Sequence, residues 1–98
     1  MLGETARSMR AFEVHLNGEK LCLAGVGKGI LAITVNWVAR PRRSDEIGGL
    51  AVGGLIDATG RHVEWTNRRL QIGDEVRIKV VEKDAVDRPR KHKGKGRA

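Results

Sequence analysis

The chain has 98 residues, which is enough for one domain and too short for the large nucleotide-binding and barrel architectures of many enzymes. Hydrophobic residues make up 40% of the chain and aromatic residues only 3%, so we expect an aliphatic core. The formal net charge of +7 favours acidic partners or nucleic acid, and the single cysteine excludes an intramolecular disulfide and a multi-cysteine zinc site.

The first predicted element is a β-hairpin. Residues 9–16 alternate, with Phe12, Val14 and Leu16 on one face, as in a half-buried strand. Asn17-Gly18 follows, and this dipeptide favours a type I′ turn because both residues tolerate positive φ angles. A two-residue turn predicts a register in which Leu16 faces Glu19, His15 faces Lys20, Val14 faces Leu21, Glu13 faces Cys22 and Phe12 faces Leu23.

Four further strands are predicted along the chain. A glycine-rich connection over residues 24–29 leads into a β-branched strand over residues 30–38. A charged loop over residues 40–46 precedes a strand over residues 50–56, in which Gly53-Gly54 indicates a bulge. After a turn at residues 57–60, Val63 and Trp65 alternate with polar residues. Gly73-Asp74 begins the last strand, in which Val76, Ile78 and Val80 share one face.

The basic charge is concentrated at the end of the chain. Residues 88–98 contain six of the 19 Lys and Arg residues and no acidic residue, so residues 1–87 hold 13 basic against 12 acidic side chains. Proline and glycine interrupt this segment, which has almost no apolar side chain to bury. We therefore predict an antiparallel β domain over residues 9–87 and a disordered basic tail over residues 88–98.

No segment shows helical apolar spacing, and about six strands at roughly ten-residue spacing predict an all-β fold. We expect a single small antiparallel barrel or sandwich. Because few aromatic residues leave the core modest and edge strands must be covered, a homodimer is plausible. The predicted core contains Phe12, Val14, Leu21, Leu23, Leu31, Ile33, Val35, Trp37, Val52, Val76, Ile78 and Val80.

The sequence offers no assembled catalytic, cofactor or metal site. The predicted hairpin register brings Glu13 opposite Cys22 and His15 diagonally near it, but a strand cysteine is far more often a small packing residue. His15 and His62 lack the spacing of metal ligands, and His92 belongs to the tail. Residues 25–29 resemble a phosphate loop only superficially, since the Walker spacing and the following helix are missing.

Clusters of basic residues are the one constellation with a testable biochemical meaning, because they attract a phosphate backbone without reading its sequence. Aromatic stacking platforms are not predicted beside them, since Trp37 and Phe12 align with core faces and Trp65 is ambiguous. The candidate nucleic-acid contacts are Arg40, Arg42, Arg43, Arg68, Arg69, Arg88, Arg90, Lys91, Lys93, Lys95 and Arg97.

Residues 62–65 and 69–82, with their Trp65 and their Gly73-Asp74-Glu75-Val76 turn, resemble a group of small, uncharacterised bacterial β-domain proteins. The hairpin turn at Asn17-Gly18 and the strand over residues 31–37 are similar to their N-terminal half. The resemblance covers residues 9–88 and implies a compact β domain without transferring any catalytic residue. Those proteins end in acidic or mixed tails, so the basic tail departs from them and its function is not implied.

These observations predict a non-enzymatic protein-interaction module without a cofactor. The alternative is a nucleic-acid- or ribosome-associated protein that binds the phosphate backbone through its tail and its Arg-rich loop. The first residues lack an apolar signal core and no segment is apolar enough to span a membrane, so we expect a cytoplasmic protein.

Overall fold

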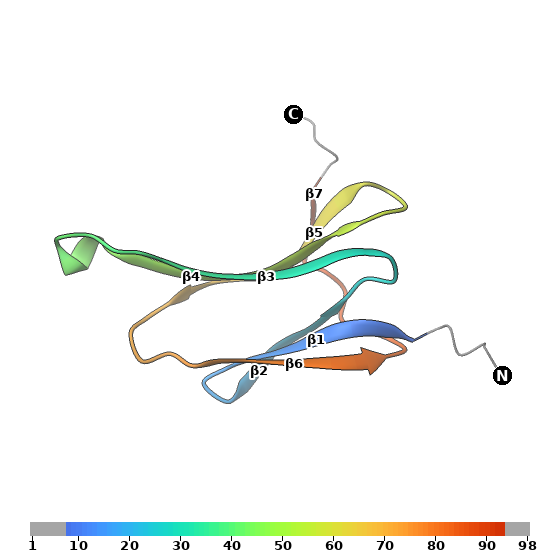
Figure 1. The fold of residues 1–98 in the computed structure, drawn as a ribbon, viewed down its shortest axis with the longest axis horizontal. Coiled ribbons are helices and arrows are strands. Elements are labelled where there is room, and N and C mark those ends of the chain that lie inside the picture. Colours follow the sequence, from blue (N-terminus) through green and yellow to red (C-terminus); the bar gives the residue numbers. More distant parts are fainter. Residues whose placement is uncertain (1–7, 94–98) are drawn as a thin grey trace.

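The structure is a computed structural model that describes residues 8–93. It is an antiparallel β-sandwich of two sheets, so the prediction of an all-β fold is confirmed (Figure 1). Sheet A has the strand order β2-β1-β6 and sheet B the order β3-β4-β5-β7. The strands are β1 (Met9–Leu16), β2 (Glu19–Gly25), β3 (Gly29–Val38), β4 (Ile47–Ile56), β5 (Arg61–Leu70), β6 (Val76–Lys83) and β7 (Lys91–Lys93), with a 3-10 turn, η2, at Arg43–Asp45.

The β1–β2 turn has the predicted type, but the register of the hairpin differs from the prediction. Asn17 and Gly18 both have positive φ angles, as a type I′ turn requires. Leu16 faces Glu19 and His15 faces Lys20 as expected, and the register then shifts so that Val14 faces Cys22. Leu21 is the extra residue of a β-bulge. The shift turns Cys22 and Ala24 into the core and leaves Leu23 beside Glu13 on the outer face.

A second bulge lies in sheet B opposite Gly53, but it is on β5 and not in the strand of Gly53-Gly54, where the sequence indicates one. The register between β4 and β5 shifts after Val52, and Trp65 is the extra residue on β5. In a regular strand two consecutive side chains point to opposite faces, but because of the bulge the consecutive residues Trp65 and Thr66 are both buried. Each sheet therefore contributes one bulged strand to the core.

The core lies between β1 and β2 of sheet A and β4 and β5 of sheet B. The two sheets approach each other most closely where β2 faces β5. Phe12, Leu21, Leu31, Ile33 and Val76 pack partly buried against this core. Its fully buried members are Val14, Cys22, Ala24, Leu50, Val52, Val63 and Trp65.

One side of the sandwich is closed by the segment that follows β6. Asp87 lies along the free edge of β2, where its N–H donates to the Leu23 carbonyl (2.9 Å) and its carboxylate accepts the Leu23 N–H (2.8 Å). The Asp87 carbonyl accepts the Trp65 indole N–H of β5 (2.7 Å). Val86 covers Gly25 and the buried Ala11 on the outer face of sheet A. This segment, residues 84–90, therefore connects both sheets, and we call it the strap.

The strap continues into residues for which the sequence predicts disorder. Lys91–Lys93 instead form β7, which pairs antiparallel with residues 62–64 of β5. Arg90 donates its N–H to the Glu64 carbonyl (2.9 Å) and its guanidinium to the Glu64 carboxylate (3.2 Å). Part of the segment for which the sequence predicts disorder therefore lies along β5, which offers an edge that these residues can pair with. The remainder of the tail, with Lys95 and Arg97, lies outside the described residues.

Candidate interaction surfaces

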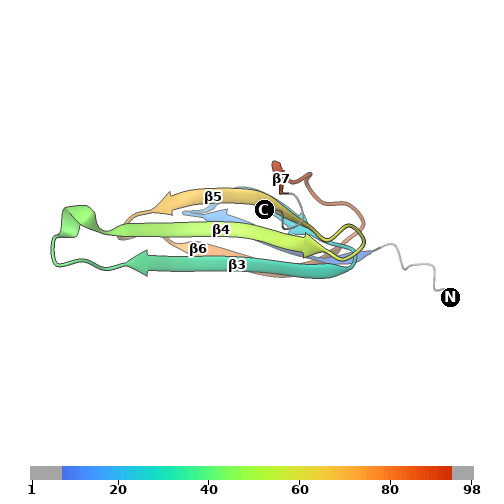
Figure 2. The same cartoon turned by 90° about the horizontal axis from the view of Figure 1, so that it is seen from above.

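The side of the sandwich opposite the strap is open. Figure 2 shows β3 at the border of sheet B, and in sheet A the border strand on this side is β6. By their register with buried Val14 and Val52, the side chains of Val35, Ile78 and Val80 point toward the space between the sheets. They are nevertheless 55%, 43% and 66% exposed. The prediction that they are core residues is wrong, because no strand of the facing sheet covers them.

We call this surface, formed by the outer edge of β3 with Val35, Ile78 and Val80, the open side. A groove of about 300 Å³ enters it between the sheets. Phe12, Leu31 and Val80 are among the residues that line the groove. The open side therefore combines the exposed apolar side chains of Val35, Ile78 and Val80 with a groove of mixed polar and apolar lining.

The backbone of β3 leaves hydrogen-bonding groups unused along the open side. Asp57 donates its N–H to the Lys28 carbonyl, and the β3–β4 register continues from this pair without a shift. Antiparallel strands alternate between residues that bond to the partner strand and residues whose N–H and C=O groups point away. The odd-numbered residues from Leu31 to Trp37 therefore direct these groups outward. Within residues 8–93, no strand pairs with this edge.

A second surface lies at the end of sheet B that extends beyond sheet A (Figure 1). A cavity of about 410 Å³ is lined there by Trp37, Arg43 and Arg69, together with Glu46, Gly48, Leu70, Gln71 and Ile72. The Trp37 ring lies against Gly48 so closely that any Cβ at this position would overlap it. It is 41% exposed, which overturns its prediction as a core residue. We call this surface the Trp37 pocket.

Hydrogen bonds fix the orientation of Trp37. Its indole N–H donates to Glu46 Oε1 (3.1 Å), and Glu46 Oε2 accepts the Arg40 backbone N–H (3.1 Å). These two hydrogen bonds, the one from Arg40 first, lower the pKa of the Glu46 carboxyl. The charged carboxylate therefore holds both the loop and the indole in place.

The predicted basic residues divide between these surfaces and the strap. Arg43 and Arg69, from two separate clusters, meet at the Trp37 pocket, and among the described residues neither takes part in an ion pair. Arg42 pairs with Asp45 (3.9 Å), and Arg40 lies at the start of the same loop. Arg68 lies on β5 and its charge helps to lower the pKa of Asp74. Arg88, Arg90, Lys91 and Lys93 belong to the strap and β7.

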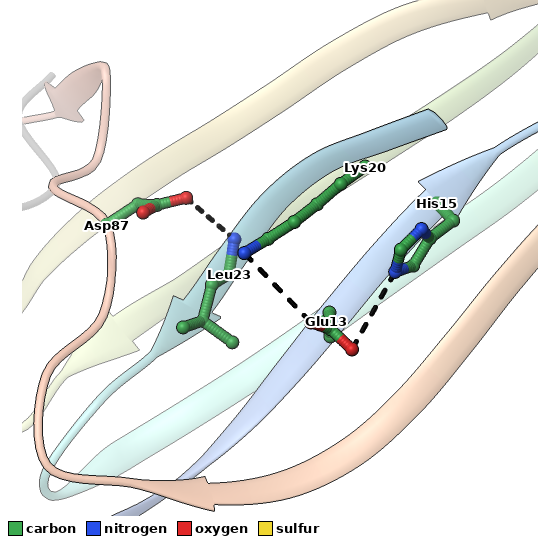
Figure 3. Close-up of polar contacts among 5 residues, drawn as sticks. All are labelled: Glu13, His15, Lys20, Leu23 and Asp87. Carbon is green, nitrogen blue, oxygen red and sulfur yellow. Dashed lines mark hydrogen bonds and ion pairs between the residues drawn. The ribbon is translucent and has the colours of Figure 1, made fainter. Parts of the chain in front are cut away.

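The candidate thiol site does not assemble. The bulge moves Cys22 to the core, whereas Glu13 and His15 remain on the outer face of β1 (Figure 3). There Glu13 pairs with His15 (3.7 Å) and Lys20 (4.0 Å), close to the contact between Leu23 and Asp87. Burial raises the pKa of the Cys22 thiol, so it is a poor nucleophile.

Residues 8–93 contain no group of three His, Cys, Asp or Glu side chains that could hold a metal ion. Within the same residues no helix is long and apolar enough to cross a membrane. The chain matches no protein family, no curated protein and no solved structure. The two surfaces must therefore be interpreted from their own geometry.

Proposed function

We propose that this chain is a non-enzymatic protein-interaction module that binds another polypeptide chain along its open side. The observation that carries the proposal is the edge of β3. This strand has ten residues, contains no charged side chain and no proline, and runs against β4 without a bulge. Edge strands of soluble proteins are normally interrupted or charged, because a regular apolar edge invites pairing with another chain.

The neighbouring edge shows the protection that β3 lacks. β6 carries Arg77, Lys79 and Lys83, which are all exposed. A strand added beside β3 would gain main-chain hydrogen bonds from its odd-numbered residues. It would also cover Val35, Ile78 and Val80, so that backbone groups supply affinity and the apolar side chains supply specificity.

The proposal places this module in the cytoplasm, where its buried free Cys22 needs no partner. No nucleophile, base or metal site among the described side chains suggests a reaction, which supports a binding role.

The test compares the natural chain with two variants as bait in an extract of its source cells. Val35→Lys places a charge on the open side, and Ala58→Lys is the control, because Ala58 is exposed in the β4–β5 turn and lines neither surface. We expect a polypeptide that the natural chain and Ala58→Lys retain and that Val35→Lys loses. Equal retention by all three baits would contradict binding through the open side.

A second candidate function is nucleic-acid binding, which the Trp37 pocket favours. Arg43 and Arg69 flank an indole that is exposed and fixed in orientation. Single-strand binders combine such a stacking surface with cationic groups that contact phosphate. Exposed Trp37 thus offers an aromatic surface for stacking, which the sequence analysis did not predict because it assigned Trp37 to the core. In this interpretation the tail adds further phosphate contacts.

A salt titration against unrelated single-stranded oligonucleotides tests this second function. Affinity should fall with salt by about 0.7 log units per neutralised phosphate for each log unit of salt. Trp37→Leu should weaken binding, because base stacking on an aromatic ring contributes ~1–3 kcal/mol per base. Arg43→Gln with Arg69→Gln should reduce the slope. Undetectable binding of the full chain at low salt would exclude this function.

A further inference from the structure

We infer that the polypeptide that pairs with the open side is β3 of a second copy of this chain. The inference rests on the proposed function and names its partner. The two β3 strands would run antiparallel about a two-fold axis perpendicular to sheet B, which passes between the two Thr34 residues. Each sheet B would then continue into that of the other copy.

The residues of β3 are complementary to themselves in this register. On the inner face Ile33 faces Val35 of the second copy and Leu31 faces Trp37, so apolar side chains meet apolar side chains. On the outer face Ile30 faces Val38, and Ala32 faces Asn36. The two Thr34 side chains face each other, and paired threonines are a favourable cross-strand contact. Ile30 and Val38 are otherwise exposed on the outer face of sheet B. A copy of β3 therefore satisfies every one of these positions.

The hydrogen-bonding pattern agrees with the same register. Odd-numbered residues of β3 direct N–H and C=O groups outward, and a two-fold axis at Thr34 places odd-numbered residues opposite odd-numbered residues. The Thr34 pair is then a non-hydrogen-bonded pair, in which Cα atoms lie about 4.5 Å apart. No backbone bond between β3 and β4 has to break.

Charge favours β3 over β6 as the strand that pairs with its own copy. Residues 1–87 hold 13 basic against 12 acidic side chains, so the domain as a whole is close to neutral and the choice of edge depends on the local charge of each strand. β3 is uncharged, whereas β6 would oppose its own arginine and lysines. Like charges on facing strands destabilise a pair.

The open side is also large enough for a stable dimer. Ten residues at about 3.3 Å give an edge about 33 Å long, and two sheets about 10 Å apart with their side chains are about 20 Å deep. The surface covered is on the order of 700 Å² per copy, close to the ~800 Å² per partner of a standard interface. Val35, Ile78 and Val80 would lie within it.

Cysteine cross-linking of the full chain tests the register. Thr34→Cys should give a disulfide-linked dimer under mild oxidation, because the two residues face each other. Ala32→Cys is the matched control on the same exposed face. The two copies of residue 32 would be separated by about four residues along the strands, or about 13 Å, which is too far for a disulfide. Equal cross-linking of both variants would overturn the inference.

Sedimentation equilibrium tests the dimer without an introduced cysteine. The natural chain and Ala58→Lys, changed in the exposed β4–β5 turn, should dimerise. Val35→Lys should raise the dissociation constant at least ~100-fold, because a lysine would be buried opposite Ile33. Val35→Pro should do the same, since its lost N–H points away from β4. Circular dichroism verifies that each variant is folded. A dimer that persists in both Val35 variants would contradict the inference.

The two proposals can fail separately. The natural chain could stay monomeric at all concentrations while its retention of another polypeptide still depends on Val35. In that case the inferred β3–β3 dimer is wrong, and the proposed binding of a polypeptide along the open side is supported. If the natural chain is monomeric and retains nothing, both are wrong.

Discussion

Cys22 of β2 and Thr66 of β5 lie near each other in the core, where burial raises the pKa of the Cys22 thiol and the Thr66 side chain lowers it to a smaller extent. Cys22 follows the bulged residue of β2, and Thr66 follows the bulged residue of β5. Both side chains are buried, and Thr66 is the buried polar residue of the described core. The two bulges therefore bring a thiol and a hydroxyl together inside an otherwise apolar interior.

The first prediction concerns Cys22 and pH. Burial raises the pKa of its thiol, so the folded chain keeps the proton when the unfolded chain begins to lose it, near pH 8.5. The contribution to stability is therefore present below that pH and is lost as the pH rises toward the folded pKa. Denaturant titrations should show a smaller decline at alkaline pH in Cys22→Ala. A thiol reagent should modify the folded chain much more slowly than the unfolded chain, and equal rates would contradict this.

The second prediction concerns the link between two turns. Asn17 Nδ2 donates to Asp74 Oδ1 (3.0 Å), and the Gln71 N–H donates to Asp74 Oδ2 (2.7 Å). These hydrogen bonds, that from Asn17 first, lower the pKa of Asp74. Its contribution to stability is present above the unfolded pKa of about 3.9 and is lost as the pH falls through the lower folded pKa. Asp74→Asn should remove this part of the acid dependence.

Asn17 allows the same link to be tested from the other turn. Its side chain also accepts the Glu75 N–H (2.9 Å), and its φ angle is 52°. Asn17→Gly keeps the turn conformation and removes only the side-chain bonds, whereas Asn17→Ala adds about 1–2 kcal/mol of left-handed strain. Thermal unfolding should rank the natural chain first, Asn17→Gly second and Asn17→Ala last. Equal stability of the two variants would show that the backbone conformation has no energetic role.

The third prediction concerns Gly48. An added Cβ would overlap the Trp37 ring, so Gly48→Ala should displace the indole and disturb its bond to Glu46. The exposed Trp37 and the buried Trp65 can be distinguished by acrylamide quenching of their fluorescence. We expect increased quenching in Gly48→Ala and no change in Gly49→Ala, where the added Cβ would meet the Asn36 side chain at 3.2 Å. Identical quenching in all three proteins would contradict the described position of Trp37.

The fourth prediction separates the contribution of residues 84–87 of the strap to stability from that of residues 88–98. Deletion of residues 88–98 removes β7 and the Arg90–Glu64 ion pair but keeps Val86 and Asp87, so the sandwich should remain folded. Deletion of residues 84–98 also removes the acceptor of the Trp65 indole N–H and the cover over Gly25. It should lower the free energy of unfolding by about 2 kcal/mol or more relative to the shorter deletion. Equal stability of the two truncated chains would contradict a structural role for the strap.

The sequence predicts the strands well, because local alternation and turn residues are sufficient for that purpose. Asn17-Gly18 specifies the turn type, whereas Gly53-Gly54 indicates a bulge in β4 and the bulge lies opposite it, at Trp65 of β5. The bulge at Leu21 has no such signal. Leu21, Cys22 and Leu23 are all apolar, so the sequence pattern satisfies either register, and only packing against the second sheet decides between them.

The candidate site could be predicted only in part, because alternation gives the face of a side chain and not what covers that face. Val35 and Val80 point inward as predicted, yet the facing sheet does not reach them. The meeting of Arg43, Arg69 and Trp37 depends on how far sheet B extends past sheet A. The sequence predicts β3 as an uncharged strand. Its position at the border of sheet B depends on the strand order, which local alternation does not specify.

The strand order has a consequence for how the chain folds. β3, β4 and β5 form a meander of neighbouring segments, whereas sheet A joins β1 to β6, with Met9 facing Lys83. Contacts between segments so distant in the chain form slowly, because a long loop must close first. Synthesis on the ribosome imposes the same order, since β6 emerges after every strand that it has to join. The β3–β4–β5 part of sheet B can therefore form before β6 is available, while β1 and β2 remain an isolated hairpin until β6 completes their sheet.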